Sequence, residues 1–384
     1  MAKKRKKAGA GAKAAAKKAR PALKKSLQPA KKPVSRHARK SFFKNIEARP
    51  ASQRVIVITG ATGRIGRAII SRFSREPGIS MRLIGRRMPH GFALPSNAKF
   101  FKADISRPKD YMRALRGSSA VIHLAGLVSF SAPLGELMEQ NAANSGILAS
   151  ACVEAGVPKL VLASSIAVYG KDIAGKEIDE RFPANPTTDY GKSKLEGENE
   201  ALKSRGKLKI AILRLGLVYG AGIDFGYYKM LDYITRGKMR IIGSGQNMLP
   251  FVHSSDVASA FFLACVHDNY RSGSIFNIVG ELKSQLECLG MASQFLGAPE
   301  VCARLDYGLA SAYAASARIL ACKAGLGDCK KACESEEFIS VMASDRRIVG
   351  RKAWEVLGFK ARVPLASGIA EVARAYLKDR EGTK

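Results

Sequence analysis

The feature that most constrains this chain is a run of β-branched residues leading directly into a glycine-rich turn. Residues 55–59 read as a buried strand, and an apolar helical stretch follows at 68–70. Between them, Gly60 permits a tight turn, Gly63 lets the backbone approach a diphosphate, and Gly66 lets the helix pack closely on the strand. Phosphates bind where such a turn opens a helix. The segment therefore predicts a dinucleotide-binding βα unit.

Strand and helix patterns alternate through the first half of the chain, which predicts an α/β fold with a doubly wound parallel sheet covered on both faces. The expected strands are 81–85, 98–102, 120–124, 159–163 and 209–213, and the expected helices are 108–116, 137–155 and 190–204. From residue 221 the pattern is less regular. We expect one domain over 49–384, with a Rossmann core at about 54–220 and a smaller substrate-binding part mainly in 221–384.

Positive charge is concentrated at the N-terminus. Residues 1–50 hold 18 Lys and Arg against one acid, so they carry +17 of the net charge of +32. Residues 1–48 are rich in Lys, Ala and Pro without an apolar period, which predicts a disordered basic tail. The tail resembles the Lys/Ala-rich tails of histone H1-like proteins, and contact with nucleic acid or another anionic surface is expected. A solubilising role is the simpler alternative.

The apolar segments are too short for a transmembrane helix, so we expect a soluble protein. We expect it to be intracellular and cytoplasmic, while organelle or nuclear targeting by the basic tail stays open. Seven cysteines, an odd number with no CxxC pair, favour reduced thiols. Cys322, Cys329 and Cys333 lie close together in the sequence, but no His is near to complete a familiar zinc set, so no metal is expected.

A candidate catalytic set lies between the predicted strands at 159–163 and 209–213. Tyr190 and Lys194 are spaced i and i+4, so both side chains share one face of the predicted helix. Ser165 follows a predicted strand, at the end where open α/β sheets bind ligands. An ammonium beside a phenol lowers the pKa of the phenol, so we expect Tyr190 to exchange a proton with an alcohol or ketone. Packing of Tyr190 and solvation of Lys194 form the alternative interpretation.

Several motifs occur together in a characteristic order. They are residues 59–66 (TGATGRIG), 123–126 (HLAG), 164–170 (SSIAVYG), 190–194 (YGKSK), 214–220 (RLGLVYG), 251–258 (FVHSSDVA), 276–278 (FNI) and 352–359 (KAWEVLGF). From about residue 54 to its C-terminus the chain resembles the extended short-chain dehydrogenase/reductases, which are similar to NAD-dependent epimerases and dehydratases. The resemblance implies a Rossmann fold, a Ser165-Tyr190-Lys194 triad and a bound nicotinamide cofactor. It also suggests a homodimer through paired helices.

The resemblance also assigns residues that contact the cofactor. They are Gly60, Thr62, Gly63, Arg64, Ile65, Gly66, Asp104, Leu124, Ala125, Gly126, Tyr190 and Lys194. His123 and Asn141 match family positions near the cofactor too. Arg86 and Arg87 follow the second predicted strand, where NAD users usually carry an acid for the ribose 2′-hydroxyl. A guanidinium suits a 2′-phosphate, so NADP is favoured, with NAD as the alternative.

Departures from the family pattern separate the candidate functions. Ile166 and Ala167 stand where dehydratases of the family place Asp-Glu, which argues against sugar dehydration. Leu217 stands where nucleotide-sugar epimerases usually have Asn, whereas Arg214 keeps binding of a sugar nucleotide open. We therefore expect an NAD(P)-dependent oxidoreductase that interconverts a secondary alcohol and a ketone on a small molecule. The alternatives are a UDP-glucose-like 4-epimerase with bound NAD, and a nucleotide-binding scaffold or sensor whose tail binds nucleic acid.

Overall fold

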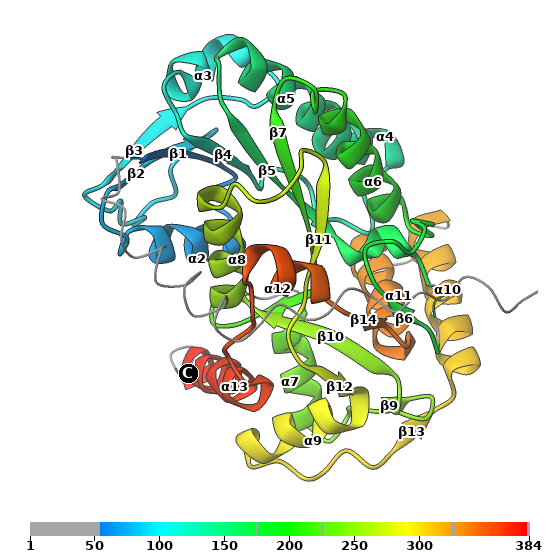
Figure 1. Cartoon of the computed structure of the whole chain (residues 1–384). Coiled ribbons are helices and arrows are strands. Elements are labelled where there is room, and N and C mark those ends of the chain that lie inside the picture. Colours follow the sequence, from blue (N-terminus) through cyan, green and yellow to red (C-terminus); the bar gives the residue numbers. More distant parts are fainter. Residues whose placement is uncertain (1–53, 172, 174, 224–225, 324–327, 382–384) are drawn as a thin grey trace, which may run out of the picture. The chain divides into compact units, whose positions relative to one another are not determined.

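β1 lies inside a seven-stranded sheet of order β11-β7-β5-β4-β1-β2-β3, in which every neighbouring pair is parallel. The computed structural model describes residues 54–171, 173, 175–223, 226–323 and 328–381. The strands of this sheet are β1 (Arg54–Thr59), β2 (Ile79–Gly85), β3 (Ala98–Lys102), β4 (Ala120–His123), β5 (Lys159–Ser165), β7 (Lys209–Leu215) and β11 (Ser274–Ile278). The predicted α/β fold class is confirmed (Figure 1).

Helices cover both faces of this sheet because successive strand residues point in opposite directions. Ile56 and Ile58 of β1 pack in a cluster with residues of α2 and α8, whereas Val57 packs on the other face with residues of α3 and α5. The helices of the two faces are α2 (Arg64–Phe73), α3 (Pro108–Leu115), α5 (Asn144–Glu154), α6 (Asp189–Leu202) and α8 (Ser254–Val266). The seventh strand, β11, comes from beyond residue 220, and α12 (Arg351–Leu357) packs beside it.

A second layer surrounds a three-stranded sheet of order β12-β10-β8. Its strands are β8 (Leu217–Tyr219), β10 (Met248–His253) and β12 (Leu282–Ser284), and its helices are α7 (Tyr227–Thr235), α9 (Gln285–Leu296) and α13 (Leu365–Glu381). An apolar cluster that includes Leu249, Leu289 and Val372 joins these elements. α9 begins with a capping box, in which Ser284 and Glu287 exchange hydrogen bonds with each other's backbone.

The remaining elements are short strand pairs and a helical hairpin. The pairs are β6 (Glu177–Ile178) with β14 (Arg347–Ile348) and β9 (Ile241–Ile242) with β13 (Arg304–Leu305). The hairpin is α10 (Tyr307–Lys323) packed on α11 (Cys329–Ala343). Among the described residues, no helix is long and apolar enough to cross a membrane. The predicted basic tail, residues 1–48, lies outside the described residues.

The hairpin contains a disulfide between Cys322 and Cys329. The prediction that all cysteines are reduced thiols is therefore wrong at this pair. Spacing alone did not reveal it, because packing of α10 on α11 brings together the end of one helix and the start of the next. Five cysteines are free: Cys152, Cys265, Cys288, Cys302 and Cys333.

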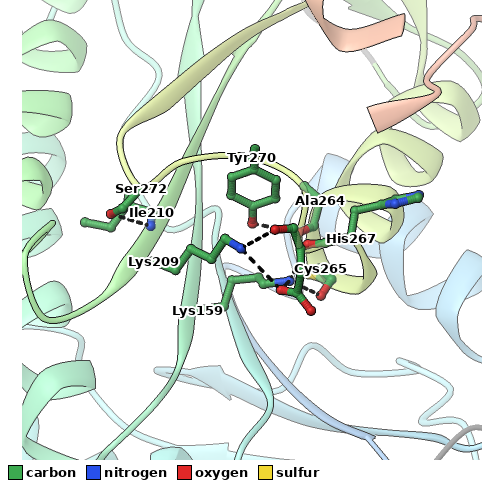
Figure 2. A network of polar contacts seen from close by, with 9 residues as sticks. Lys159, Lys209, Ile210, Ala264, Cys265, His267, Tyr270 and Ser272 are labelled. Carbon is green, nitrogen blue, oxygen red and sulfur yellow. Dashed lines mark hydrogen bonds and ion pairs between the residues drawn. The ribbon is translucent and has the colours of Figure 1, made fainter. Parts of the chain in front are cut away.

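A polar network fixes the end of α8 to the amino-terminal ends of β5 and β7 (Figure 2). Lys159 is buried, and its Nζ donates to the carbonyl oxygens of Cys265 and His267 at 2.7 Å each. The same Nζ lies 3.1 Å from Oδ1 of Asp268, and Lys209 lies over the ring of Tyr270. A cation at the C-terminus of a helix satisfies carbonyls that have no partner within the helix.

We expect Lys159→Met to lower the free energy of unfolding by about 2–4 kcal/mol, because it leaves two carbonyls without their donor. Urea unfolding measures the change. The matched control is Lys207→Met, which alters an exposed side chain just before β7 and should change stability by less than about 0.5 kcal/mol. Equal stability of the two variants would contradict a structural role for this network.

Candidate active site

The turn after β1 leaves no room for side chains at two of its glycines. Gly60 has φ +66°, and a Cβ there would lie 2.6 Å from the backbone nitrogen of Ala125. A Cβ at Gly66 would lie 2.4 Å from the carbonyl oxygen of Ala61. Gly63 precedes the first residue of α2, whose first turn contains no acidic residue. This is a backbone cradle at a helix N-terminus, and its shape and electrostatics fit a diphosphate.

The other residues assigned to the cofactor lie at the same edge of the sheet. Thr62 is in the turn, and Arg64 and Ile65 begin α2. Leu124, Ala125 and Gly126 follow β4, which pairs with β1 directly beside the turn. The strand order runs in opposite directions from β1 and β4, and open α/β sheets bind ligands at such a point.

Arg86 and Asp104 follow β2 and β3, on the side of β1 away from β4. Arg86 is exposed. The backbone N–H and hydroxyl of Ser106 donate to Asp104, and these hydrogen bonds, helped by the charge of Arg86, hold the pKa of Asp104 below its usual range. The structure therefore places a guanidinium and an ionised carboxylate near each other at this end of the crevice.

The three predicted catalytic residues come together between β5 and α6. Ser165 is the last residue of β5, and its Oγ accepts a hydrogen bond from the N–H of Ala167 at 3.1 Å. Tyr190 and Lys194 lie in the first half of α6, whose N-cap, Thr188, accepts from the N–H of Gly191 at 3.0 Å. Lys194 Nζ donates to the carbonyl oxygen of Ala163 at 2.6 Å, which holds the helix against the strand.

Burial determines the protonation of this group. It raises the pKa of Tyr190 to about 12, with a hydrogen bond to Ser165 acting in the opposite direction. Burial also lowers the pKa of Lys194 to about 8, against the charge of Glu198. The predicted lowering of the Tyr190 pKa by Lys194 is not found: desolvation raises this pKa, and the Lys194 ammonium donates to the carbonyl of Ala163.

A buried ion pair lies behind the catalytic helix. Arg214 of β7 donates through Nε and Nη2 to the two carboxylate oxygens of Glu198 at 2.9 and 2.7 Å. Ser164 of β5 donates to the same carboxylate, and the Arg214 guanidinium lies over the ring of Tyr169. Arg214 is 4% exposed, so its guanidinium is held inside the fold by Glu198. Glu198 was missed in the sequence, although its position four residues after Lys194 signals a shared helix face.

Asn141 connects the loop after β4 to α6. It lies in a π-helical segment, η2 (Met138–Ala143), between α4 (Leu134–Leu137) and α5. Its Oδ1 accepts from the N–H of Leu127 at 2.7 Å, and its Nδ2 donates to the carbonyl of Leu127 and to Ser193 Oγ, each at 2.9 Å. A Cβ at Gly126 would lie 2.5 Å from the Asn141 Oδ1. The expected helix over 137–155 is thus interrupted by a π-helical segment, at the place where the Asn141 side chain binds Leu127 and Ser193.

Two more aromatic side chains, those of His123 and Phe130, lie at this edge of the sheet. His123 Nδ1 lies 2.7 Å from Thr59 Oγ1, and burial with the nearby charge of Lys194 lowers the pKa of His123 to about 3, so this ring is neutral. Phe130 packs edge-to-face on Tyr190, with ring centroids 5.8 Å apart. Phe130 lies in the loop of residues 127–133, between β4 and α4, and the sequence did not single it out because an isolated aromatic in a loop has no distinguishing pattern.

A cleft of about 660 Å³ adjoins the turn. Its lining combines Thr62–Arg64, side chains of α2 from Arg67 to Arg72, Arg75 just beyond α2, residues 221–223, and Ser254 and Ser255 at the start of α8. Tyr190 and Ser165 do not contribute to it. The cleft meets the phosphate end of the site, whereas the catalytic side chains lie toward β5.

Comparison with known proteins agrees with this arrangement. A model of the NAD dependent epimerase/dehydratase family matches residues 56–279, more than half of the chain. The chain belongs to this family. The matched region runs from β1 through β11, so the NAD dependent epimerase/dehydratase model covers the whole central sheet and each of the residues assigned to cofactor and catalysis.

Individual members of the family show the range of its chemistry. The chain is 31% identical over 258 residues to UDP-glucose 4-epimerase of Azospirillum brasilense, covering 59% of this chain and 72% of that protein. It is 27% identical over 233 residues to the mouse (Mus musculus) sterol-4-alpha-carboxylate 3-dehydrogenase, decarboxylating, covering 58% and 63%. Another curated relative is matched over only 55% of its length. Epimerases and dehydrogenases are therefore both among the relatives of this chain.

Solved structures show the same fold. MoeE5 in complex with UDP-glucuronic acid and NAD superposes with a TM-score of 0.65 at 26% identity, covering 84% of this chain and 99% of that one. MoeE5 has also been solved with UDP-glucose and NAD. The resemblance to the extended short-chain dehydrogenase/reductases is confirmed, and the family to which the chain belongs is one of NAD-dependent enzymes.

Proposed function

We propose that this chain is an NAD(P)-dependent oxidoreductase that interconverts a secondary alcohol and a ketone. One observation carries the proposal: Ser165, Tyr190 and Lys194 gather at the same sheet edge as the glycine cradle. Ile166 and Ala167 are the next residues after Ser165 and hold no acid or base for dehydration. Leu217 packs against the apolar cluster of the second layer and offers no hydrogen bond from its side chain.

A nicotinamide dinucleotide, when bound, would supply or accept the hydride. The cradle at Gly60, Gly63 and Gly66 would hold its diphosphate, and the Leu124–Gly126 turn would lie beside it. Tyr190 is protonated in neutral solution because its pKa is about 12, so it gives a proton to the carbonyl oxygen of a ketone. The Ser165 hydroxyl donates a hydrogen bond to the same oxygen. Lys194 supplies positive charge beside this group, and the Phe130 ring packs edge-to-face on Tyr190.

Cofactor choice gives a test that needs no known substrate. We expect NADPH to bind more tightly than NADH, because the Arg86 guanidinium pairs with a 2′-phosphate. Arg86→Glu should weaken NADPH binding by roughly 10- to 100-fold, as loss of one charge-assisted contact implies. Nicotinamide fluorescence measures both affinities.

The matched control for this titration is Arg271→Glu, an exposed arginine beside β11 at the opposite end of the sheet. It makes the same charge change and should leave NADPH affinity within about twofold. Tighter binding of NADH to the unaltered chain would contradict the NADP assignment, and binding of neither cofactor would contradict the enzyme mechanism.

A nucleotide-sugar 4-epimerase with NAD is the second candidate, favoured by the complexes of MoeE5 with UDP-glucose and UDP-glucuronic acid. Epimerisation returns the hydride to the substrate, so the reduced cofactor does not accumulate. The two reactions are distinguished by incubation with UDP-glucose and, separately, with a panel of secondary alcohols. An increase in the absorbance of the reduced nicotinamide on addition of an alcohol supports the oxidoreductase. Formation of the 4-epimer of UDP-glucose without such an increase supports the epimerase.

A further inference from the structure

We propose that the reduced side chains of Cys322, Cys329 and Cys333 form a binding site for a thiophilic metal ion such as Zn²⁺, located where α10 meets α11. The three Sγ atoms all lie within 4.8 Å of one another, and Sγ of Cys322 is 3.8 Å from Sγ of Cys333. This is the one group of three close metal-ligating side chains in the described ranges. It is separate in sequence and position from the residues assigned to catalysis.

The spacing of the sulfur atoms suits a metal ion. Zn–S bonds of about 2.3 Å in tetrahedral geometry separate two sulfurs by roughly 3.8 Å, which is the separation of Cys322 and Cys333. Cys322 and Cys329 are joined as a disulfide, and their Cα atoms are 4.6 Å apart. A phosphine reductant supplies two electrons and water supplies two protons, so that the disulfide becomes two thiols and the phosphine becomes its oxide. The sulfurs can then separate by rotation about the Cα–Cβ bonds.

The α10–α11 hairpin brings the three cysteines close together where α10 ends and α11 begins. Cys329 is the first residue of α11 and Cys333 follows four residues later, so both lie on one face of that helix. Cys322 lies next to the last residue of α10. An ion pair between Arg318 of α10 and Glu336 of α11 holds the two helices together one turn from the cluster. The ligands are therefore positioned by packing that does not depend on the disulfide.

Burial and the charges of Glu336 and Glu334 raise the pKa of the Cys333 thiol, whereas the charge of Arg318 lowers it. Zn²⁺ binding to three thiols releases three protons and leaves one net negative charge on the site. The exposed lysines Lys323 and Lys330 adjoin Cys322 and Cys329 in the chain and offset that charge. Cys322 is exposed, so a water molecule has access to the fourth metal position.

The test is a Co²⁺ titration of the full-length chain, reduced with a phosphine and freed of metal. We expect one equivalent to bind with sulfur-to-cobalt charge-transfer absorption, and Zn²⁺ to displace it. Serine replacement of Cys322, Cys329 or Cys333 should weaken binding by more than the roughly 10- to 100-fold that loss of an outer-shell partner costs. Binding should also weaken as pH falls, because protons compete for the thiolates.

Cys302→Ser is the matched control, since Cys302 is an exposed free cysteine outside the cluster. It should leave the charge-transfer band and metal affinity unchanged. Nicotinamide cofactor binding by each variant shows that the chain remains folded. No charge-transfer band from the reduced chain would overturn the proposal, and so would a band unaffected by the three replacements or abolished by Cys302→Ser.

Discussion

Replacing Tyr190 with phenylalanine should lower the rate of hydride transfer by about 10²- to 10⁴-fold, the usual contribution of a positioned acid or base. The substitution removes the proton that the phenol exchanges with the substrate oxygen. It keeps the ring that packs on Phe130, 5.8 Å away, so the local structure should persist. Cofactor affinity should change little, whereas kcat for ketone reduction should fall. Stopped-flow absorbance of the reduced nicotinamide measures the step directly.

The control for this substitution is Tyr313→Phe, which removes a hydroxyl from a tyrosine that is 77% exposed on α10. It should leave kcat unchanged. If Tyr190→Phe retained full turnover while Tyr313→Phe behaved as expected, Tyr190 would not be the proton donor, and the proposed mechanism would be wrong. An equal loss of cofactor affinity and turnover would instead show that Tyr190 binds the cofactor.

Replacing Lys194 with methionine should abolish activity and make the fold more stable. Burial lowers the pKa of Lys194 from 10.5 to about 8, which corresponds to about 3 kcal/mol of destabilisation when the ammonium is charged. The variant loses the hydrogen bond to Ala163, worth about 1 kcal/mol. The expected net gain near pH 7 is therefore about 2 kcal/mol in the free energy of unfolding.

The gain should disappear in alkaline solution. Between pH 8 and 10.5 the folded chain gives up the Lys194 proton while the unfolded chain keeps it, so the stability of the unaltered protein rises with pH. Above pH 10.5 the side chain is neutral in both states and methionine has no electrostatic advantage. Urea unfolding at pH 7 and at pH 10.5 measures the difference.

Lys192→Met is the matched control, because Lys192 lies on the same helix but is exposed and pairs with exposed Asp189. Its effect on stability should stay within about 0.5 kcal/mol at both pH values. A destabilising effect of Lys194→Met at pH 7 would show that its contact with Ala163 outweighs the cost of burying the charge.

The sheet could be predicted because its strands carry strong local signals. The run before Gly60 is buried and β-branched, and strand patterns alternate with helix patterns as far as Leu213. The positions of Ser165, Tyr190 and Lys194 followed from the same logic, since the ends of parallel strands share an edge. Electrostatics did not follow, because the Tyr190 pKa depends on burial that no local pattern encodes.

Contacts between distant segments account for the other differences. The position of Arg214 at a strand end suggested that it binds a ligand. In the structure, Glu198 of α6 accepts hydrogen bonds from both Nε and Nη2 of this guanidinium. Cys322 and Cys329 are seven residues apart, and only the hairpin geometry joins them. Phe130 is assigned to the candidate site only because it packs on Tyr190. Each of these depends on tertiary packing, which composition and spacing do not specify.

The π-helical segment around Asn141 fixes one end of the 127–133 loop and leaves another part of the loop exposed. Asn141 fixes the root of the 127–133 loop at Leu127 and fastens it to Ser193, yet Val128 beyond that root is 51% exposed. A substitution at Val128 can therefore change the exposed surface of the loop while Asn141 keeps its hydrogen bonds to Leu127 and Ser193. In the proposed enzyme, substrate preference can thus change at this exposed position without displacing Ser165, Tyr190 or Lys194.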